Sequence, residues 1–245
     1  MSQFKHGNNF FIRIFILSVC VLTLNRISFA QVRKVLNLPN YEKEALHFGF
    51  NLGVNNTNFI VYPRTLDDSI YIVESTPQTG FNLGIISDLR VHDYVTLRFV
   101  PNLSFAQRNL DYSIHQKKGV GVYTKKVEST FLNFPIDLKV RSARLNNGAA
   151  YVLAGAAYTI DLASQKYVDN TSLTLTEQVI KLRKDDIALE AGVGVEFYLP
   201  YFKFALEGKL SLGIRNLLIN DNTIFSNSIE KLNSKVFLLS ITFEG

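Results

Sequence analysis

Several residue types are scarce or absent in this chain of 245 residues. It has no tryptophan, one methionine and one cysteine, Cys20. A single cysteine excludes an intramolecular disulfide, and a cysteine inside an apolar N-terminal stretch is a poor candidate for catalysis or metal binding. Charged residues make up only 19%, yet no apolar run reaches the roughly 20 residues that a transmembrane helix needs. The chain is therefore neither a disulfide-stabilised domain nor a helical membrane protein.

The N-terminus has the pattern of a targeting segment. Basic residues up to Arg13 precede the apolar run Ile14–Leu24, and small residues follow up to Ala30. This pattern predicts a cleaved signal peptide over residues 1–30, with Gln31 as the first mature residue. Three of the excess positive charges, those of Lys5, Arg13 and Arg26, leave with it. The small remaining charge excess gives no reason to expect a nucleic-acid partner.

The mature chain repeats one pattern, in which about ten residues alternate between apolar and polar and are followed by a break. Phe (19) and Tyr (11) are abundant, as expected of strands. In 46–55, for example, Leu46, Phe48 and Phe50 alternate with His47, Gly49 and Asn51. The pattern predicts eight strands, at 46–55, 79–90, 94–105, 129–141, 149–162, 186–197, 202–215 and 235–243.

Short and long connections alternate along the chain. Those at 91–93, 142–148 and 200–201 are short, whereas those at 56–78, 106–128, 163–185 and 216–234 are long and polar. This asymmetry is typical of outer-membrane barrels, which have short periplasmic turns and longer outer loops. A sheet in lipid must close, because lipid offers no hydrogen-bond partners.

The sequence therefore predicts an all-β, eight-stranded antiparallel transmembrane up-and-down β-barrel over residues 46–245. Residues 31–45 form a predicted periplasmic lead-in, and the location is the Gram-negative outer membrane, with its lipid and lipopolysaccharide as surroundings. Pro101 and Pro135 fall inside predicted strands, where each must occupy a bulge or a membrane boundary.

Charged residues alternate with the apolar ones and are expected to face a lumen filled by side chains. They are His47, Asp88, Arg90, Arg98, Asp137, Lys139, Asp161, Glu190, Glu196, Lys203, Glu207, Lys209 and Arg215. Aromatic residues near the strand ends are expected to form interfacial girdles. These are Tyr94, Tyr198, Tyr201 and Phe202 at one rim, and Phe59, Phe105 and Phe131 at the other.

No residue pattern points to a catalytic, cofactor or metal site. His6, His47, His92 and His115 are scattered without ligand spacing, and no helix follows the glycines Gly192 and Gly194. The carboxylates Glu190, Glu196 and Glu207 have two interpretations. They either serve as acid and base in a barrel-embedded hydrolase or acyltransferase, or they form lumenal ion pairs with Lys203, Lys209 and Arg215. The second interpretation is favoured, and with it a non-enzymatic protein.

One segment concentrates positive charge. Lys117, Lys118, Lys125 and Lys126 lie within ten residues. They either meet anionic lipopolysaccharide or an acidic partner, or belong to a solvated loop whose strands extend beyond the membrane.

Two stretches resemble a known family. Residues 38–53 (LPNYEKEALHFGFNLG) and 131–135 (FLNFP), together with the chain length, resemble PorT proteins. These are outer-membrane barrels of the type IX secretion system. The resemblance implies a role in exporting cargo with C-terminal sorting domains, other secretion components as partners, and in some species a role in gliding motility. It carries over no catalytic residue. The alternative is a general small outer-membrane barrel, adhesin-like, porin-like or structural, unrelated to secretion.

Overall fold

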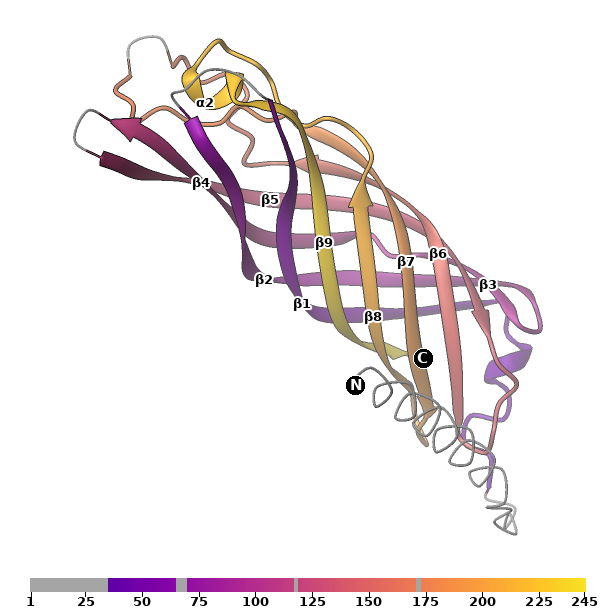
Figure 1. Cartoon of the computed structure of the whole chain (residues 1–245). Helices are drawn as coiled ribbons and strands as arrows, with labels where there is room; N and C mark the ends of the chain where they lie inside the picture. The colour runs from indigo at the N-terminus through magenta and orange to yellow at the C-terminus, as the bar shows by residue number, and fades with distance from the viewer. Residues whose placement is uncertain (1–34, 65–69, 117–118, 171–172) are drawn as a thin grey trace, which may run out of the picture. The chain divides into compact units, whose positions relative to one another are not determined.

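The computed structural model of the chain (Figure 1) describes residues 35–64, 70–116, 119–170 and 173–245. The predicted signal peptide, residues 1–30, and the start of the predicted lead-in lie outside these residues. Residues 36–245 form a single unit, an antiparallel sheet that closes on itself.

The sheet contains nine strand segments that make eight staves, where a stave is one complete crossing of the barrel wall. Apart from β3 and β4, segments that follow one another along the chain pair with each other, and the first pairs with the last, so the barrel is closed. β3 and β4 each pair with both β2 and β5, so they are two halves of one stave. The predicted barrel of eight staves is confirmed. The segments are β1 (Leu46–Pro63), β2 (Ile70–His92), β3 (Val95–Phe99), β4 (Asn102–Gln116), β5 (Gly119–Arg141), β6 (Gly148–Asp161), β7 (Asp185–Tyr198), β8 (Lys203–Gly213) and β9 (Ile229–Glu244).

The two in-strand prolines share one interruption. Pro101 separates β3 from β4, and its carbonyl accepts the N–H of Ile85 in β2. On β5, Pro135 lies opposite this interruption and keeps its register with Ala157 of β6. Proline has no N–H to donate, so placing both prolines at one point confines the lost hydrogen bonds there. The pairing of β2 is in the same register on both sides of the break.

The two faces of the barrel wall have opposite polarity. Apolar side chains such as Phe48, Ile85 and Leu189 are exposed on the outside, whereas Arg98 and Asp137 are buried inside. This arrangement suits a wall surrounded by hydrocarbon with a packed polar interior. All the predicted lumenal residues point inward except at the two ends, where Arg90 is half-buried and Arg215 lies near the loops.

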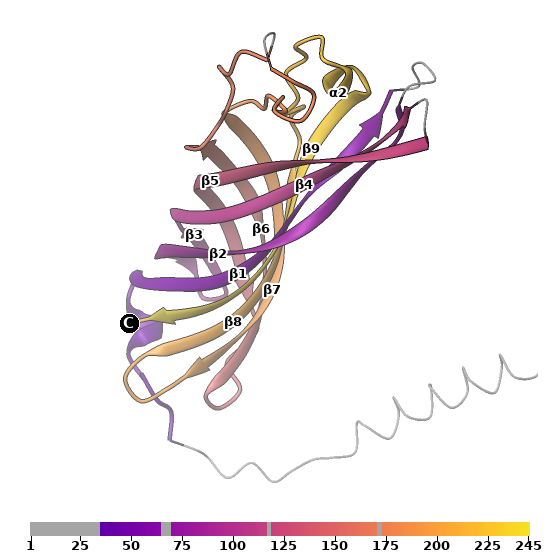
Figure 2. The same ribbon diagram turned by 90° about the vertical axis from the view of Figure 1, so that its left-hand side faces the viewer.

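Two of the four predicted long loops are instead mostly strand. β1 continues to Pro63 and β2 begins at Ile70, within the predicted loop 56–78. Likewise, β4 and β5 fill most of the predicted loop 106–128. Figure 2 shows these strands extending well beyond the rest of the barrel. The end that carries them is called the loop end here, and the opposite end, with the three short connections, the turn end.

Strands extending beyond the membrane were one of the two interpretations of the lysine-rich segment, but the bounds of the extensions were missed because their hydrophobic face reverses. Within the barrel wall, even-numbered residues of β4 such as Asn102 and Ser104 are polar and face inward. Farther along the same strand, the inward residues Leu110 and Tyr112 are apolar and fully buried. A strand leaving lipid for water must turn its apolar side chains from the outside to the inside. A search for one continuous apolar face therefore ends at the membrane boundary.

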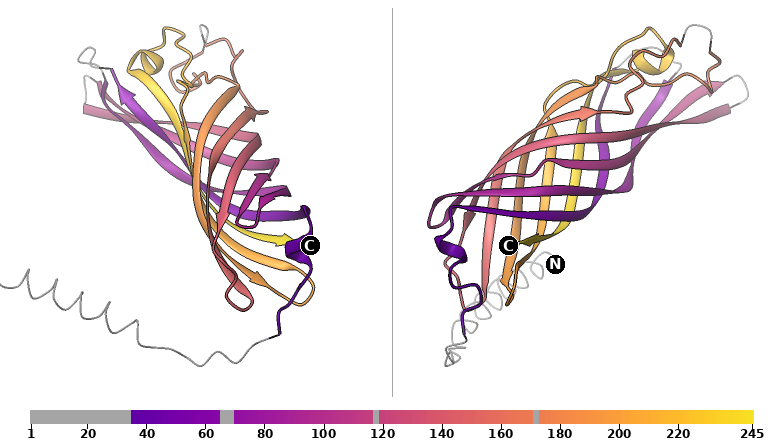
Figure 3. Two further views of the ribbon diagram at one scale, coloured as in Figure 1. Left: turned by 90° about the vertical axis from the view of Figure 1, so that its right-hand side faces the viewer. Right: turned by 180° about the vertical axis from the view of Figure 1, so that it is seen from behind.

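An apolar cap fills the loop end. It consists of Phe59, Leu110, Tyr112, Ile180, Leu182, Leu217, Leu218, Phe225, Ile229 and Leu232. The strand extensions supply some of these side chains, and the loops 162–184 and 214–228 supply others, including the short helix α2 (Ile224–Asn227). Figure 3 shows both loops folded over this end of the barrel. No helix among the described residues is both long and apolar enough to cross a membrane.

Three of the predicted rim aromatics lie inside instead. Phe59 belongs to the apolar cap and Tyr198 is buried at the turn end. Phe131 lies under the guanidinium of Arg108. All three have the inward phase of their strands, which the prediction from strand ends alone did not take into account. Tyr94 and Tyr201 are exposed at the turn end, as expected.

Candidate functional site: the filled barrel interior

A cluster of seven charged residues fills the turn-end half of the lumen. It comprises the cations Arg98, Lys139 and Lys203 and the carboxylates Asp88, Glu196, Glu207 and Glu244, each 5% exposed or less. The members come from six strands, so the cluster joins opposite sides of the barrel. It is called the charged cluster below.

Arg98 is the centre of this cluster. Its Nε and Nη2 donate to the two carboxylate oxygens of Asp88, both at 2.8 Å. Its Nη1 donates to Glu207 at 2.9 Å, and its Nη2 also donates to Glu244 at 2.7 Å. A planar guanidinium suits such paired contacts with carboxylates. Tyr151 completes the site by donating to Glu207 at 2.7 Å.

The two lysines link the remaining carboxylates. Lys139 pairs with Glu196 and lies 3.6 Å from Asp88. Lys203 pairs with Glu196 at 3.2 Å and with Glu244 at 2.5 Å. Every carboxylate of the charged cluster therefore contacts at least one cation, as buried charges require.

Glu244 was not predicted to take part. It is the penultimate residue. The preceding residue, Phe243, faces outward, and the centroid of its ring lies 5.0 Å from that of the Phe50 ring. Strand alternation then turns Glu244 inward, where it is fully buried. The end of β9 pairs with β1, and its period-two phase was the signal that could have placed Glu244 in the lumen.

The carboxylates considered for hydrolase chemistry are held in ion pairs. Glu190 pairs with Lys209 at 2.7 Å, and Lys209 also contacts Asp137 at 3.1 Å. Glu196 and Glu207 belong to the charged cluster. The expected ion pairs of Lys203 and Lys209 are therefore present, whereas Arg215 pairs with Asp185 instead. The arrangement is that of a packed interior and offers no free acid–base pair at these three residues.

The chain before β1 closes the turn-end mouth. Tyr41, in the 3-10 helix η1 (Tyr41–Lys43), stacks on His47 with ring centroids 3.8 Å apart. Its hydroxyl donates to Glu244 at 3.1 Å, and Lys203 lies 4.8 Å from its ring centre. Burial raises the pKa of Tyr41, so the hydroxyl remains a donor. Tyr41 thus extends the charged cluster to the edge of the lumen.

Further contacts hold the same segment against the turns. The side chain of Asn37 donates to the Tyr198 carbonyl at 2.9 Å, and the backbone carbonyl of Asn37 accepts from Arg144 at 2.5 Å. Arg141 donates to Glu42 at 2.7 Å. Residues 37–42 are therefore part of the folded barrel.

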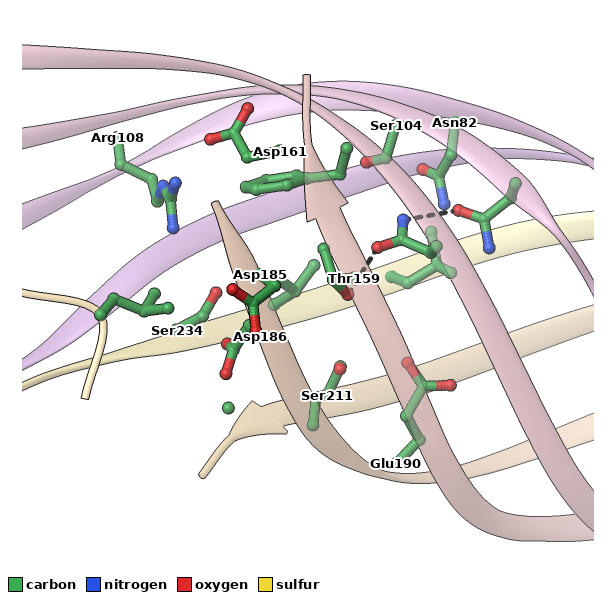
Figure 4. A pocket seen from close by; sticks show the side chains of 18 of the residues that line it. Asn82, Ser104, Arg108, Thr159, Asp161, Asp185, Asp186, Glu190, Ser211 and Ser234 are labelled. Carbon is green, nitrogen blue, oxygen red and sulfur yellow. Dashed lines mark hydrogen bonds between the residues drawn. The ribbon is translucent and has the colours of Figure 1, made fainter. Parts of the chain in front are cut away.

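A polar chamber lies between the charged cluster and the apolar cap. Its cavity, of about 70 Å³, exceeds the space that one water molecule needs. Figure 4 shows its side chains converging from several strands, with Asp161 and Asp186 among them. Thr159 donates to Asn133, which donates to Asn102, both at 2.8 Å. These groups make the chamber suited to hold water.

Arg108 is the buried cation of the chamber. It is 1% exposed, and its guanidinium lies between the rings of Phe59 and Phe131, at 4.1 and 4.9 Å. One N–H donates to Ser129 at 2.8 Å, while Nε and Nη1 have no protein acceptor among the described residues. Water in the chamber suits these donors. No sequence signal distinguished Arg108, because it lies in a predicted loop.

The charged cluster blocks the lumen between two separate cavities. A second cavity, of about 30 Å³, lies beside Tyr41 and is separated from the polar chamber by the charged cluster. Within the described part of the chain, no group of three or more His, Cys, Asp or Glu side chains is arranged to hold a metal ion. The interior therefore supports the wall and offers no open channel.

Comparison with known proteins identifies the family. The family described as outer membrane protein beta-barrel domain matches residues 29–218. No curated protein matches the chain.

Solved structures with similarity include three small barrels. Ail of Yersinia pestis is 14% identical, with 82% of this chain and 100% of that chain covered and a TM-score of 0.37. The Neisserial surface protein A is 11% identical, with coverages of 81% and 98% and a TM-score of 0.42. The N-terminal barrel domain of OprF from Pseudomonas aeruginosa is 11% identical, with coverages of 80% and 97% and a TM-score of 0.35.

Proposed function

The chain belongs to the outer membrane protein beta-barrel domain family, and from this premise we propose that it is a non-enzymatic, non-conducting component of the type IX secretion system. In barrels of this kind the short turns face the periplasm, so the loop end faces outward. The protein acts by contact with other secretion components and supports the export of cargo with C-terminal sorting domains. Gliding motility depends on it where the same machine drives gliding.

The secretion role rests on the resemblance to PorT proteins in residues 38–53 and 131–135. The first stretch contains Tyr41 and His47, which close the turn end against Glu244. The second contains Pro135, which lies opposite the interruption at Pro101. Both stretches that resemble PorT proteins therefore contain residues that close the turn end or lie opposite the strand interruption.

The blocked lumen is the observation that favours a contact role. The charged cluster crosses the barrel with side chains that are 5% exposed or less. A small barrel of eight staves is filled by side chains, so cargo cannot pass through it. Its contribution to secretion must come from its outer surfaces or its two ends.

Deletion of the gene tests the secretion role. We expect sorting-domain cargo to accumulate in the periplasm, and export to return when the full chain is supplied. A chain carrying Tyr201→Ala, a change at a side chain that is 89% exposed, serves as a matched complementing control. Normal export of cargo in the deletion strain would contradict the role.

Export of the chain itself follows from the proposed signal peptide. Cleavage after Ala30 leaves Gln31 as the first residue, and mass spectrometry of the outer-membrane form reads this directly. A mass that retains residues 1–30 would contradict the cleavage.

The alternative is a general barrel unrelated to secretion, adhesin-like or porin-like. Strand extensions at the loop end favour the adhesin form, because they present a sheet beyond the apolar wall. Loss of cell adhesion with intact cargo export, in the same deletion strain, would support this alternative. The porin form predicts single-channel conductance in planar bilayers, whereas the charged cluster predicts none.

A further inference from the structure

Three buried charged residues that line the polar chamber form no ion pair within the described chain. They are Arg108 of β4, Asp161 at the end of β6 and Asp186 near the start of β7, which are 1%, 6% and 6% exposed. In the charged cluster, by contrast, every carboxylate contacts a cation. Burying a charge without a partner is costly. The chamber therefore differs from the cluster in holding charges that a ligand could pair.

The strand register places these three residues in a row across the inner face of the wall. Asp161 is the cross-strand neighbour of Phe131 on β5, and the guanidinium carbon of Arg108 lies 4.9 Å from the centre of the Phe131 ring. Thr159, two residues before Asp161, is opposite Asp186, so the two carboxylates are diagonal neighbours. Figure 4 shows Arg108 and both aspartates around the same chamber. One end of the row is cationic, and the other end carries two carboxylates.

Each of the three residues keeps hydrogen-bonding capacity that no described group uses. Arg108 donates to Ser129 through Nη2, whereas its Nε and Nη1 have no acceptor in the part of the chain that the structure describes. Oδ1 of Asp161 accepts from two backbone N–H groups at 3.0 and 3.3 Å, and no described donor bonds to its Oδ2. Asp186 accepts from a backbone N–H through Oδ1 at 2.8 Å. A carboxylate offers about four acceptor positions, so both aspartates can accept more bonds.

The volume and charge of the chamber limit what it can hold. One water molecule needs about 10–15 Å³ of such space, so a cavity of about 70 Å³ has room for about five non-hydrogen atoms. Arg183 and Lys184 also line the chamber and are exposed, so it opens to solvent beside the loop 162–184. The lining contains four cationic side chains and four carboxylates. Because these charges balance, a ligand without net charge is favoured over a cation or an anion.

We propose that the polar chamber binds a small zwitterion, an α-amino acid of the size of glycine. The ligand carboxylate accepts from the Arg108 guanidinium, as carboxylates commonly do, and the ligand ammonium group donates to Asp161 and Asp186. Such a ligand pairs all three residues and adds no net charge. Acetate would leave the aspartates without a cation, and methylammonium would leave Arg108 without an anion. The inference does not depend on the secretion role, since the site is complete within this chain.

The test is equilibrium dialysis of radiolabelled glycine against the full barrel in detergent micelles, with unlabelled compounds as competitors. We expect saturable binding at one site per chain, with displacement by unlabelled glycine and alanine. Acetate and methylammonium each carry only one of the two charges, and leucine is too large for the chamber, so each should displace glycine at least tenfold less well. Absence of saturable binding, or equal displacement by any of these three compounds, would overturn the proposal.

Variants locate the site. Arg108→Met removes the partner of the ligand carboxylate and should weaken glycine binding at least tenfold, whereas Arg90→Met at the turn end should leave it unchanged. Asp186→Asn should weaken binding severalfold, and the control Asp93→Asn changes a side chain that is 77% exposed. Ser211→Leu fills the chamber and keeps every charge, so it should abolish binding even if a charge variant fails to fold. The heat-modifiable gel shift confirms folding of each variant. Undiminished binding by folded Ser211→Leu or Arg108→Met would refute the assignment.

Discussion

Replacing Arg98 by methionine tests whether the charged cluster holds the barrel together. Arg98 is 1% exposed and bonds to three carboxylates at 2.7–2.9 Å. Without it, the partners that remain among the described residues are Lys139 at 3.6 Å for Asp88 and the Tyr151 hydroxyl for Glu207. Removing one partner of a buried ion pair costs about 3–5 kcal/mol. We expect the free energy of unfolding to fall by that amount.

Denaturant titration in lipid vesicles measures this loss. Because the chain has no tryptophan, unfolding is followed by tyrosine emission and by the gel shift. Arg90→Met is the matched control, because its ion-pair partner Asp93 is 77% exposed and such pairs contribute about 0–1 kcal/mol. Arg98→Met combined with Glu207→Gln should lose less than the sum of the two single changes, because the uncompensated carboxylate is gone. A loss below about 1 kcal/mol for Arg98→Met would refute the reasoning.

Three further predictions concern the wall, the mouth and the cap. Gly194→Val places a Cβ against the Tyr151 ring and should lower the free energy of unfolding by about 3 kcal/mol. The control Gly208→Ala meets no atom within 4 Å and should be neutral. Equal stability of the two variants would contradict the packing. Tyr41→Ala should speed hydrogen exchange in residues 37–45, with Tyr201→Ala as the control, and unchanged exchange would argue against a closed mouth. Lys125→Met releases the carbonyls of Leu175 and Thr176, so chymotrypsin should cut near Leu175 faster than in Lys126→Met; identical cleavage would show that the lysine does not hold the loop.

The barrel wall was predictable because one physical rule governs all eight staves. Lipid outside and charge inside produce the period-two pattern, so residues such as Phe48 and Asp137 were assigned to the correct faces. The connections at the turn end were predictable for the same reason, since each follows directly where the pattern stops. The two prolines also correctly indicated an irregularity in the strands. Sequence alone did not show that Pro101 and Pro135 share one interruption.

The interior contacts were harder to predict, because they join residues far apart in the sequence. Alternation shows that Arg98 faces inward but not that Asp88, Glu207 and Glu244 surround it. Tyr41 precedes the first strand, where no periodic pattern reveals its direction. Its place over the lumen depends on stacking with His47, a contact that only the folded turn end creates.

The strand extensions connect these findings to function. On β4, Phe105 still faces outward, while Leu110 five residues later is fully buried inside. Sliding the barrel deeper would bring the polar outer residues Gln107 and Asn109 into hydrocarbon, and raising it would expose apolar wall to water. The reversal of the apolar face therefore fixes the depth of the barrel in the membrane. Since the strand extensions continue the same strands, they are held at a set height above the lipid.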